Sequence, residues 1–414
     1  MKIAVIGTGI SGLTAAYLLY RDFDLTVYEA NGYVGGHTHT VDVDLPEGLH
    51  AVDTGFIVFN ERTYPNFCRI LDRLGVASQP SRMTFSVKCE KTGLEYNSHN
   101  LNTFFAQRKN LVSPSFWRMI LEIFRFRSRF DHYLDISDQD LPLLRILRDQ
   151  GFSSRFIEHF IIPLGSSLWS ADPKRFGEFP LQTFVRFFKN HAFLDIRNLF
   201  PWRVIRGGSK RYVEKLTAGF ADRIRTNTPV TGIQRFEDRV EVTDCNGKVD
   251  CYDQIILAFH SDQALALLKD VTPAERDILG AIPYQENDTV LHTDARILPE
   301  RRWIWASWNY LIPREMKNRA VLTYDMNILQ TLQASRELCV TLNGSDAIDP
   351  AAIKARFIYH HPVFTTRAPE VQKRHAEISG IHRTHFCGAY WGYGFHEDGV
   401  NSALQVARWF GKEL

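Results

Sequence analysis

Three glycines and one acid near the N-terminus have the types and spacing of a unit that binds phosphate and ribose. Gly7, Gly9 and Gly12 form G-x-G-x-x-G directly after the apolar run 3–6, and helical spacing follows. Such glycines permit a tight turn, close approach of a pyrophosphate to the backbone, and close packing of helix on strand. The helix N-terminus adds unpaired N–H groups. Glu29 ends a second apolar run, where its carboxylate can accept ribose hydroxyls. The pattern predicts a dinucleotide site.

A second glycine pair distinguishes between dinucleotides, because an NAD site does not require it. The run E-A-N-G-Y-V-G-G-H at 29–37 resembles the E-A-x-x-x-x-G-G-[RH] motif of the flavoprotein amine oxidase superfamily. D-T-G at 53–55 resembles the D-x-G segment that follows in the same superfamily. The resemblance implies FAD as the cofactor, with the second pair letting the backbone pass close to the pyrophosphate and the flavin.

The C-terminal part of the chain resembles the segment that returns to the cofactor in this superfamily. Residues 384–390 are expected to form a strand and a glycine turn, and a helix is expected from Gly399 onward. The helix N-terminus would stabilise negative charge at the flavin pyrimidine ring. Ala389 stands where most of the superfamily has an acid, and Val230 stands where a backbone contact with adenine is expected. The resemblance thus implies these FAD contacts: Gly7, Gly9, Ile10, Ser11, Gly12, Glu29, Ala30, Gly35, Gly36, His37, Thr38, Asp53, Thr54, Gly55, Val230, Gly388, Ala389, Gly399 and Val400.

Composition bounds the class of protein. The chain has 414 residues, 44% of them hydrophobic and 23% charged, which favours a globular protein of two intertwined domains. A net charge of +2 argues against a nucleic-acid protein. The six cysteines form no C-x-x-C pair and no zinc spacing, so we expect no metal and a reducing cytoplasm. No signal peptide or membrane span is expected.

The order of apolar patterns predicts an α/β fold, with a Rossmann-type FAD-binding domain interleaved with an α+β substrate domain. We assign 1–75, 200–270 and 380–414 to the first domain, and 76–199 and 271–379 to the second. A hairpin is expected at 85–96, and a buried strand at 255–258 should return to the nucleotide sheet. Residues 100–191 are mainly helical, and 290–361 suit an antiparallel sheet.

The stretch 115–134 interleaves aromatic residues with arginines and allows two interpretations. It is either a core helix of a substrate lid or a helix lying on a membrane surface. Apolar helical stripes usually pack in a core, which favours the first interpretation.

Several longer segments narrow the resemblance, which covers residues 1–410. They include F-W-R-M-I at 116–120, W-A-S-W-N at 305–309 and F-C-G-A-Y-W-G-Y-G-F-H-E-D-G at 386–399. The chain resembles the flavoprotein domain fused to plant cyclopropane fatty acid synthases, and bacterial desaturases of methyl-branched acyl chains in furan fatty acid synthesis. In that group Ala389 is the expected residue. The resemblance implies a lipid acyl-chain substrate. A lipid methyltransferase is a further expected partner, and the basic-aromatic stretch 115–134 allows peripheral contact with the inner membrane face.

Candidate catalytic residues come from the same C-terminal segment. His396, Glu397 and Tyr393 should border the flavin ring, where one of them could take the proton that accompanies loss of a hydride from carbon. The alternative is that they only hydrogen-bond the loop. Weaker candidates are His37, His39 and His292. The aromatic residues expected to line a pocket or the core are Trp303, Trp305, Trp308 and Tyr310.

Three functions remain in competition. The first is an FAD-dependent desaturase or oxidase of acyl chains. The second is an amine oxidase, which would need a lysine–water arrangement and an aromatic cage that the sequence does not reveal, or a polyprenoid or porphyrin oxidase on the same fold. The third is a flavin-binding accessory protein that presents lipid to a methyltransferase.

Overall fold

The N-terminal glycine segment lies in the middle of a five-stranded parallel sheet. The computed structural model of this chain describes residues 1–137, 141–194, 200–315 and 318–414. The sheet has the order β10-β2-β1-β14-β20, and every neighbouring pair is parallel. Its strands are β1 (Lys2–Ile6), β2 (Asp24–Tyr28), β10 (Ile224–Arg225), β14 (Gln254–Leu257) and β20 (Thr384–Phe386). The predicted return of 255–258 to this sheet is confirmed, because β14 pairs with β1.

The central strands are apolar because helices cover the sheet. Val5 pairs with Val27 on one side and Ile256 on the other, and all three are fully buried. Helix α1 (Ile10–Leu19) follows the glycine turn and packs against the C-terminal helix α15 (His396–Trp409). The sequence predicted that this helix starts at Gly399, but α15 begins three residues earlier, at His396. Asp398, inside the first turn, accepts the backbone N–H of Phe395 at 2.9 Å and so stabilises the earlier start.

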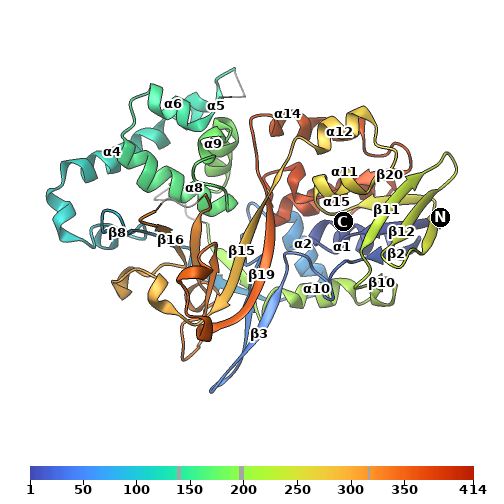
Figure 1. Ribbon diagram of the computed structural model, residues 1–414, viewed down its shortest axis with the longest axis horizontal. Helices are drawn as coiled ribbons and strands as arrows, with labels where there is room; N and C mark the ends of the chain where they lie inside the picture. Colours follow the sequence, from blue (N-terminus) through green and yellow to red (C-terminus); the bar gives the residue numbers. More distant parts are fainter. Residues whose placement is uncertain (138–140, 195–199, 316–317) are drawn as a thin grey trace.

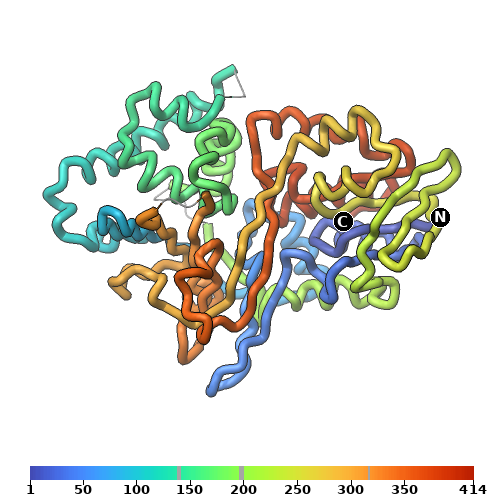
Figure 2. The backbone as a smooth tube through the Cα atoms, viewed as in Figure 1, coloured from blue at the N-terminus to red at the C-terminus, as the bar shows by residue number. Residues whose placement is uncertain are grey.

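A second, seven-stranded sheet forms a separate layer. Its order is β19-β15-β18-β17-β16-β7-β8, and only the β16–β7 pair is parallel. The predicted hairpin is confirmed as β7 (Phe85–Cys89) and β8 (Leu94–Asn97). The others are β15 (Tyr284–His292), β16 (Trp308–Ile312), β17 (Val321–Asp325), β18 (Cys339–Leu342) and β19 (Ile353–Pro362). Figure 2 shows β15 and β19 running side by side between the two halves of the molecule.

A helical layer packs on one side of this sheet, at the left of Figure 1. Its aromatic side chains join those of β7, β8 and β16 in one core. Its helices are α3 (Leu101–Phe104), α4 (Pro114–Ser128), α5 (Phe130–Leu134), α6 (Leu143–Asp149), α7 (Ser154–Phe156), α8 (Ile162–Trp169) and α9 (Leu181–Asn190), with a π-helical turn at Ile157–Ile161.

Smaller elements complete the fold. They are the hairpin β3 (Thr40–Leu45) and β4 (Gly48–Asp53), the sheet β5 (Val58–Phe59), β9 (Trp202–Ile205) and β6 (Ser78–Ser81), the sheet β11 (Val230–Arg235), β12 (Val240–Asp244) and β13 (Val249–Tyr252), and the helices α2 (Pro65–Leu74), α10 (Lys210–Thr217), α11 (Ser261–Leu267), α12 (Pro273–Leu279), α13 (Met326–Leu329) and α14 (Ala368–Lys373).

The parallel sheet draws its strands from the segments predicted for the FAD-binding domain, and the seven-stranded sheet from the other segments. The predicted α/β fold class is thereby confirmed. The domain boundary predicted at residue 199 lies outside the described residues.

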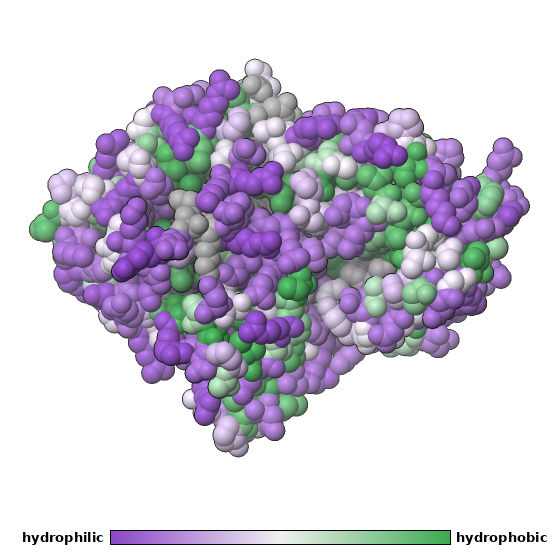
Figure 3. Space-filling view, in the orientation of Figure 1, coloured by the Kyte–Doolittle hydropathy of each residue, from purple (hydrophilic) through white to green (hydrophobic). Residues whose placement is uncertain are grey.

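In the described part of the chain, no helix combines the length and apolar character needed to cross a bilayer. Figure 3 shows a face covered mainly by hydrophilic side chains, with apolar groups scattered among them.

Candidate functional site

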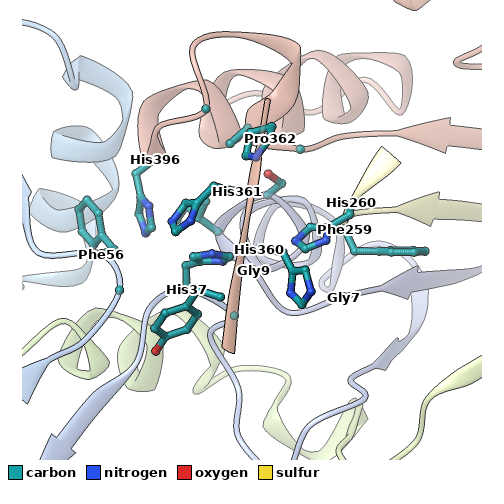
Figure 4. A pocket seen from close by; sticks show the side chains of 18 of the residues that line it. Gly7, Gly9, His37, Phe56, Phe259, His260, His360, His361, Pro362 and His396 are labelled. Carbon is teal, nitrogen blue, oxygen red and sulfur yellow. The ribbon is translucent and has the colours of Figure 1, made fainter. Parts of the chain in front are cut away.

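A cavity of about 820 Å³ opens at the carboxyl ends of the parallel strands. The ends of β1, β2, β14 and β20, the start of α15 and the strand β19 all contribute to its wall. Ligands of open α/β sheets bind at this edge, outside the carboxyl ends of the strands. Figure 4 shows the loops and histidine side chains that converge on the cavity. The fold therefore places the N-terminal glycine motif and the C-terminal segment in one site.

The three glycines of the first motif have three different surroundings. Gly7 has φ +98°, and a Cβ there would lie 2.7 Å from the carbonyl oxygen of Ala258. A Cβ at Gly12 would lie 2.0 Å from the carbonyl oxygen of Gly7, so Gly12 allows α1 to approach the turn. A Cβ at Gly9 would meet no atom within 4 Å. Gly9 therefore faces open cavity, in the position where a pyrophosphate can lie on the N-terminus of α1.

The second glycine pair closes over the first. Gly36 has φ +59°, and its backbone is so near that an added Cβ would lie 3.0 Å from the Cα of Gly9. Gly35 donates its N–H to the Oγ1 of Thr8 at 3.2 Å. The two glycine loops thus form one backbone cradle beside the cavity.

Glu29 lies at one end of the cavity with both carboxylate oxygens engaged. Oε2 accepts the N–H of Thr8 at 3.1 Å and also its hydroxyl, and Oε1 accepts the N–H of Asn31 at 2.8 Å. Oε1 also accepts the side-chain amide of Asn31 at 3.0 Å. These four bonds match the roughly four that a carboxylate accepts, so a ribose hydroxyl would bind Glu29 by replacing one of them. Ala30 and the segment 228–230 also line the cavity, and the N–H of Thr228 donates to the carbonyl of Glu29 at 2.8 Å, which places that segment beside Glu29.

The basic side chains that line the described part of the cavity are histidines. Five line the cavity: His37, His260, His360, His361 and His396. The rings of His37 and His361 have centroids 5.3 Å apart, and those of His260 and His360 5.8 Å apart. Burial, with a smaller contribution from His360, lowers the pKa of His37 to about 4. Burial also lowers the pKa of His260 to about 3, with His37 and His360 adding to the shift. At neutral pH His37 and His260 are therefore uncharged imidazoles.

The structure brings most of the predicted cofactor residues to the cavity wall. Those that line it are Gly7, Gly9, Ile10, Ser11, Glu29, Ala30, Gly35, Gly36, His37, Gly55, Val230, Gly388 and Ala389. Those that the structure places behind the wall are Gly12, Thr38, Asp53, Thr54, Gly399 and Val400. A Cβ at Gly399 would lie 2.7 Å from the side chain of Ile10, so this glycine lets α15 pack on α1.

Asp53 has an organising role behind the cavity. Its Oδ1 accepts the N–H and the hydroxyl of Ser209, both at 2.8 Å, and its Oδ2 accepts the amide of Gln330 at 3.0 Å. Burial raises the pKa of Asp53 to about 6, and bonds from Thr40 and Ser209 act against that rise. The carboxylate thereby links the start of α10 to the loop after α13.

His396 is the predicted catalytic residue that reaches the cavity. Its ring stacks on Phe56 with centroids 3.4 Å apart, and its Nε2 lies 3.0 Å from Thr38 Oγ1 and 3.1 Å from the hydroxyl of Tyr212. Burial holds the pKa of His396 well below its usual range, with His37 contributing. The position at the N-terminus of α15 acts in the same direction, since the helix dipole disfavours a cation there. His396 is therefore a neutral imidazole in a fixed orientation.

Glu397 and Tyr393 lie outside the cavity wall. The carboxylate of Glu397 accepts the N–H groups of Asn66 at 3.0 Å and Phe67 at 2.9 Å, which are in the first turn of α2. It acts as a cap on that helix. The ring of Tyr393 packs on Phe187, with centroids 5.6 Å apart. The structure thus places Glu397 at the start of α2 and Tyr393 against Phe187, both away from the cavity wall.

The weaker candidates are distributed differently. His39 stacks on Tyr33, with centroids 4.2 Å apart, and His292 is buried in the seven-stranded sheet with Nε2 2.7 Å from Thr341 Oγ1. Trp308 lines the cavity, Tyr310 is buried in the core, and Trp303 is 49% exposed. Trp305 donates its indole N–H to the carbonyl of Pro299 at 2.8 Å.

The far end of the cavity, beyond His396, is apolar and aromatic. Trp308 and Tyr324 meet edge to face with centroids 5.3 Å apart, and Trp169 and Phe187 lie 4.9 Å apart. The wall there also contains Ile57, Val58, Met83, Leu168, Phe193, Trp202, Leu329 and Phe395. Among the described lining residues, Glu29 is the only carboxylate, and there is no lysine or arginine. This end suits a long apolar group.

Sequence reasoning missed several lining residues. Thr8 links Glu29 to the second glycine loop, and it could have been found as the variable residue inside G-x-G-x-x-G. His260 lies directly before α11, and His360 and His361 lie on β19; these segments meet only in the folded chain. The adjacent pair His360–His361 gave no motif on which to base a site.

The hydrogen-bond donors around the cavity fit a bound dinucleotide. The open space at Gly9 adjoins α1, and the buried Nε2 of His37 has no partner among the described residues. No group of three histidine, cysteine or acidic side chains in that part of the chain is arranged to hold a metal ion. Cys387 is buried behind the wall, and burial raises the pKa of its thiol.

Comparison with known families gives a match over most of the chain. The family described as flavin containing amine oxidoreductase matches residues 10–291. Protoporphyrinogen oxidase 2 of Arabidopsis thaliana is 28% identical over 178 residues, which are 42% of this chain and 33% of that protein. Tryptophan 2-monooxygenase of Allorhizobium ampelinum is 56% identical over 41 residues, which are 9% of this chain and 6% of that protein. The match thus spans a third or less of the length of these relatives.

Solved structures share the fold over nearly the full length. Cyclohexylamine oxidase from Brevibacterium oxydans superposes with a TM-score of 0.69 and 15% identity, covering 99% of both chains. The CLA-producing fatty acid isomerase from P. acnes superposes with a TM-score of 0.70 and 17% identity, covering 99% of this chain and 98% of that one.

Proposed function

The chain belongs to the family of flavin containing amine oxidoreductases, and from this premise we propose that it binds FAD and dehydrogenates a methyl-branched, unsaturated fatty acyl chain of a membrane phospholipid. The observation that carries the proposal is the cavity itself. It combines a glycine cradle and the Glu29 carboxylate with an aromatic far end that has no charged residue among its described lining residues. A fatty acid isomerase with the same fold supports an acyl chain as substrate.

FAD is proposed to bind in the cavity with its pyrophosphate on the backbone cradle that Gly9 and Gly36 form. Glu29 is proposed to hold the adenosine ribose, and the segment 228–230 the adenine. His37 and its neighbouring histidines are the side chains that can meet the phosphate charge, because the described lining contains no lysine or arginine. The described lining residues include no cysteine. We propose a non-covalent cofactor, which acid precipitation should release into the supernatant.

Bound FAD supplies the two-electron oxidation by accepting a hydride from carbon. The chain's own residues would hold the substrate carbon in place and exclude water. Each methylene of the acyl chain that the apolar wall buries contributes roughly 0.8 kcal/mol to the free energy of binding. Loss of hydride and proton leaves a new C=C bond in the acyl chain. Neutral His396 would accept the proton at Nδ1, while the contacts of its Nε2 with Thr38 and Tyr212 fix the ring.

An ammonium substrate fits this wall less well. The far end offers no carboxylate and no lysine among the described lining residues, although Trp308 and Tyr324 provide aromatic faces. A cyclic apolar substrate is the second candidate, favoured by the match to a plant protoporphyrinogen oxidase.

Anaerobic turnover tests the proposal and separates an enzyme from an accessory protein that presents lipid to a methyltransferase. Holoenzyme is mixed with lipid extract under nitrogen, the flavin absorbance is followed, and the acyl chains are analysed by mass spectrometry. The proposal expects bleaching together with acyl chains that have lost two hydrogens. Absence of bleaching by lipid, or bleaching by porphyrinogen or amines alone, would refute it.

A further inference from the structure

Helix α4 has two apolar faces, and only one of them belongs to the core. Phe116, Met119 and Phe126 are fully buried in the helical layer. On the opposite face, Trp117 is 43% exposed, Leu121 65% and Phe124 48%. With about 3.6 residues per turn, these three side chains fall within about 60° of one another around the helix axis. The stretch 115–134, for which the sequence allowed a core helix or a membrane-surface helix, therefore has one buried apolar face and one exposed apolar face.

The exposed stripe continues into the segment before α4. Leu111 is 47% exposed and Val112 84% exposed. Trp117 donates its indole N–H to the carbonyl oxygen of Leu111 at 2.8 Å, which holds the two residues together. We call Leu111, Val112, Trp117, Leu121 and Phe124 the α4 face. Contiguous exposed apolar side chains of this size mark an interaction surface.

Cations border the α4 face on both sides. Between residues 108 and 129 there are six cations, Arg108, Lys109, Arg118, Arg125, Arg127 and Arg129, and one acid, Glu122. Glu122 is buried and accepts bonds from Arg118 and Ser153, so it adds no free negative charge. Around the helix, Arg118 and Arg125 lie on one side of the stripe and Arg127 on the other, each roughly 80–100° from Trp117. An apolar stripe with cations at both edges complements an anionic lipid surface.

We propose that the α4 face docks on the surface of an anionic phospholipid bilayer. Trp117, Leu121 and Phe124 enter the boundary between headgroups and acyl chains, and the arginines beside them meet lipid phosphates. The inference deepens the proposed function, since its biological purpose rests on a lipid substrate, while the binding itself requires no turnover.

The docking helix is connected to the cavity through aromatic contacts. Phe126 of α4 lies 6.1 Å from Phe184 of α9, and Phe184 lies 6.1 Å from Trp169 of α8, which lines the cavity. Figure 1 shows α4 and these helices in the same layer, remote from the β11–β13 sheet. Docking through α4 would therefore bring the apolar end of the cavity towards the bilayer.

Vesicle flotation of the holoenzyme tests the docking. Vesicles of phosphatidylcholine with phosphatidylglycerol should carry the protein upward at low salt. Binding should fall about tenfold or more in vesicles of phosphatidylcholine alone or in high salt, because screening weakens the arginine contacts. Protein that stays at the bottom with anionic vesicles at low salt would overturn the proposal.

Matched leucines control for loss of any exposed apolar side chain. Leu121 is 65% exposed on α4, and Leu49 is 66% exposed on β4. Leu121→Gln should weaken vesicle binding about tenfold, and Leu49→Gln should leave it unchanged. Equal binding of the two variants to vesicles would contradict docking of the α4 face on lipid. So would a wild-type dimer in the absence of vesicles that the Leu121→Gln substitution converts to a monomer. Detergent-dispersed lipid should bleach the flavin of Leu121→Gln as it does in wild type. Loss of bleaching there and in wild type would instead count against the proposed function.

Discussion

The imidazole of His396 lies flat on the ring of Phe56, with centroids 3.4 Å apart and planes 10° apart. The next residue, Glu397, points the other way and accepts the N–H of Phe67 at 2.9 Å. Adjacent residues at the start of α15 therefore serve two different structures, the cavity wall and helix α2. The contrast gives two separable predictions.

Replacing His396 with alanine should slow flavin reduction and leave cofactor binding intact. If His396 accepts the substrate proton, the anaerobic rate of reduction by lipid should fall roughly a hundredfold. Stopped-flow absorbance measures the rate, and flavin content per chain is the control. A rate close to wild type would remove His396 from the proton path.

Replacing Glu397 with alanine should lower stability instead. Two N–H groups in the first turn of α2 would lose their acceptor, and such a cap contributes about 1 kcal/mol to the free energy of unfolding. Denaturant unfolding measures that change. Flavin reduction by lipid should stay within about twofold of wild type, a margin far inside the range for loss of a general base. A loss as large as that of His396→Ala would return Glu397 to the proton path.

Valine at Gly9 and at Gly12 should give opposite phenotypes. A side chain at Gly9 meets no protein atom within 4 Å, so Gly9→Val should fold normally and purify without flavin. A side chain at Gly12 would collide with the carbonyl oxygen of Gly7, so Gly12→Val should be destabilised by roughly 1–3 kcal/mol or more. Circular dichroism and flavin absorbance separate the two effects. A folded Gly9→Val protein with full flavin would disprove the placement of the pyrophosphate.

The folded chain should lose stability as the pH falls from 6.5 towards 4. Burial, with a smaller effect of His375, lowers the pKa of His385 to about 4, and the side chain is only 1% exposed. Below pH 6.5 the unfolded chain binds a proton that the folded chain excludes, so the free energy of unfolding decreases with falling pH. The contribution of His385 reaches about 3 kcal/mol at most.

His385→Phe provides the matched control for that slope. The ring lies 4.5 Å from Trp409 and 4.9 Å from Phe410, and its Nε2 has no partner among the described residues. Phenylalanine keeps these contacts and cannot titrate, so urea unfolding of apo-protein should show a flatter profile between pH 6.5 and 4. An unchanged slope would mean that His385 is not the source.

Local patterns predicted the nucleotide unit because its chemistry lies within a short stretch of chain. The motif requires a turn, an open backbone, a close packing contact and an acid, and these fall in that order on Gly7, Gly9, Gly12 and Glu29. The parallel sheet followed from the apolar runs at 3–6 and 255–258, and both form neighbouring strands.

What the sequence could not predict depends on contacts between distant segments. Glu397 and His396 are equally polar neighbours, and only their packing against α2 and Phe56 distinguishes a cap from a cavity residue. The 115–134 stretch has one apolar pattern, yet half of it faces solvent because α4 lies at the edge of the helical layer. Similarly, His260, which directly precedes α11, and His361, which lies on β19, meet at the cavity only in the folded chain.

The most direct test of the proposed activity is anaerobic reduction of the enzyme-bound flavin by defined substrates. A phosphatidylcholine with a methyl-branched, unsaturated acyl chain is compared, in detergent, with its straight-chain saturated analogue, a simple alkylamine and a porphyrinogen. Our account predicts that the branched lipid bleaches the flavin stoichiometrically and yields an acyl chain with one more C=C bond, while the other three leave the spectrum oxidised. Rapid bleaching by the amine or the porphyrinogen, with none by the branched lipid, would contradict it.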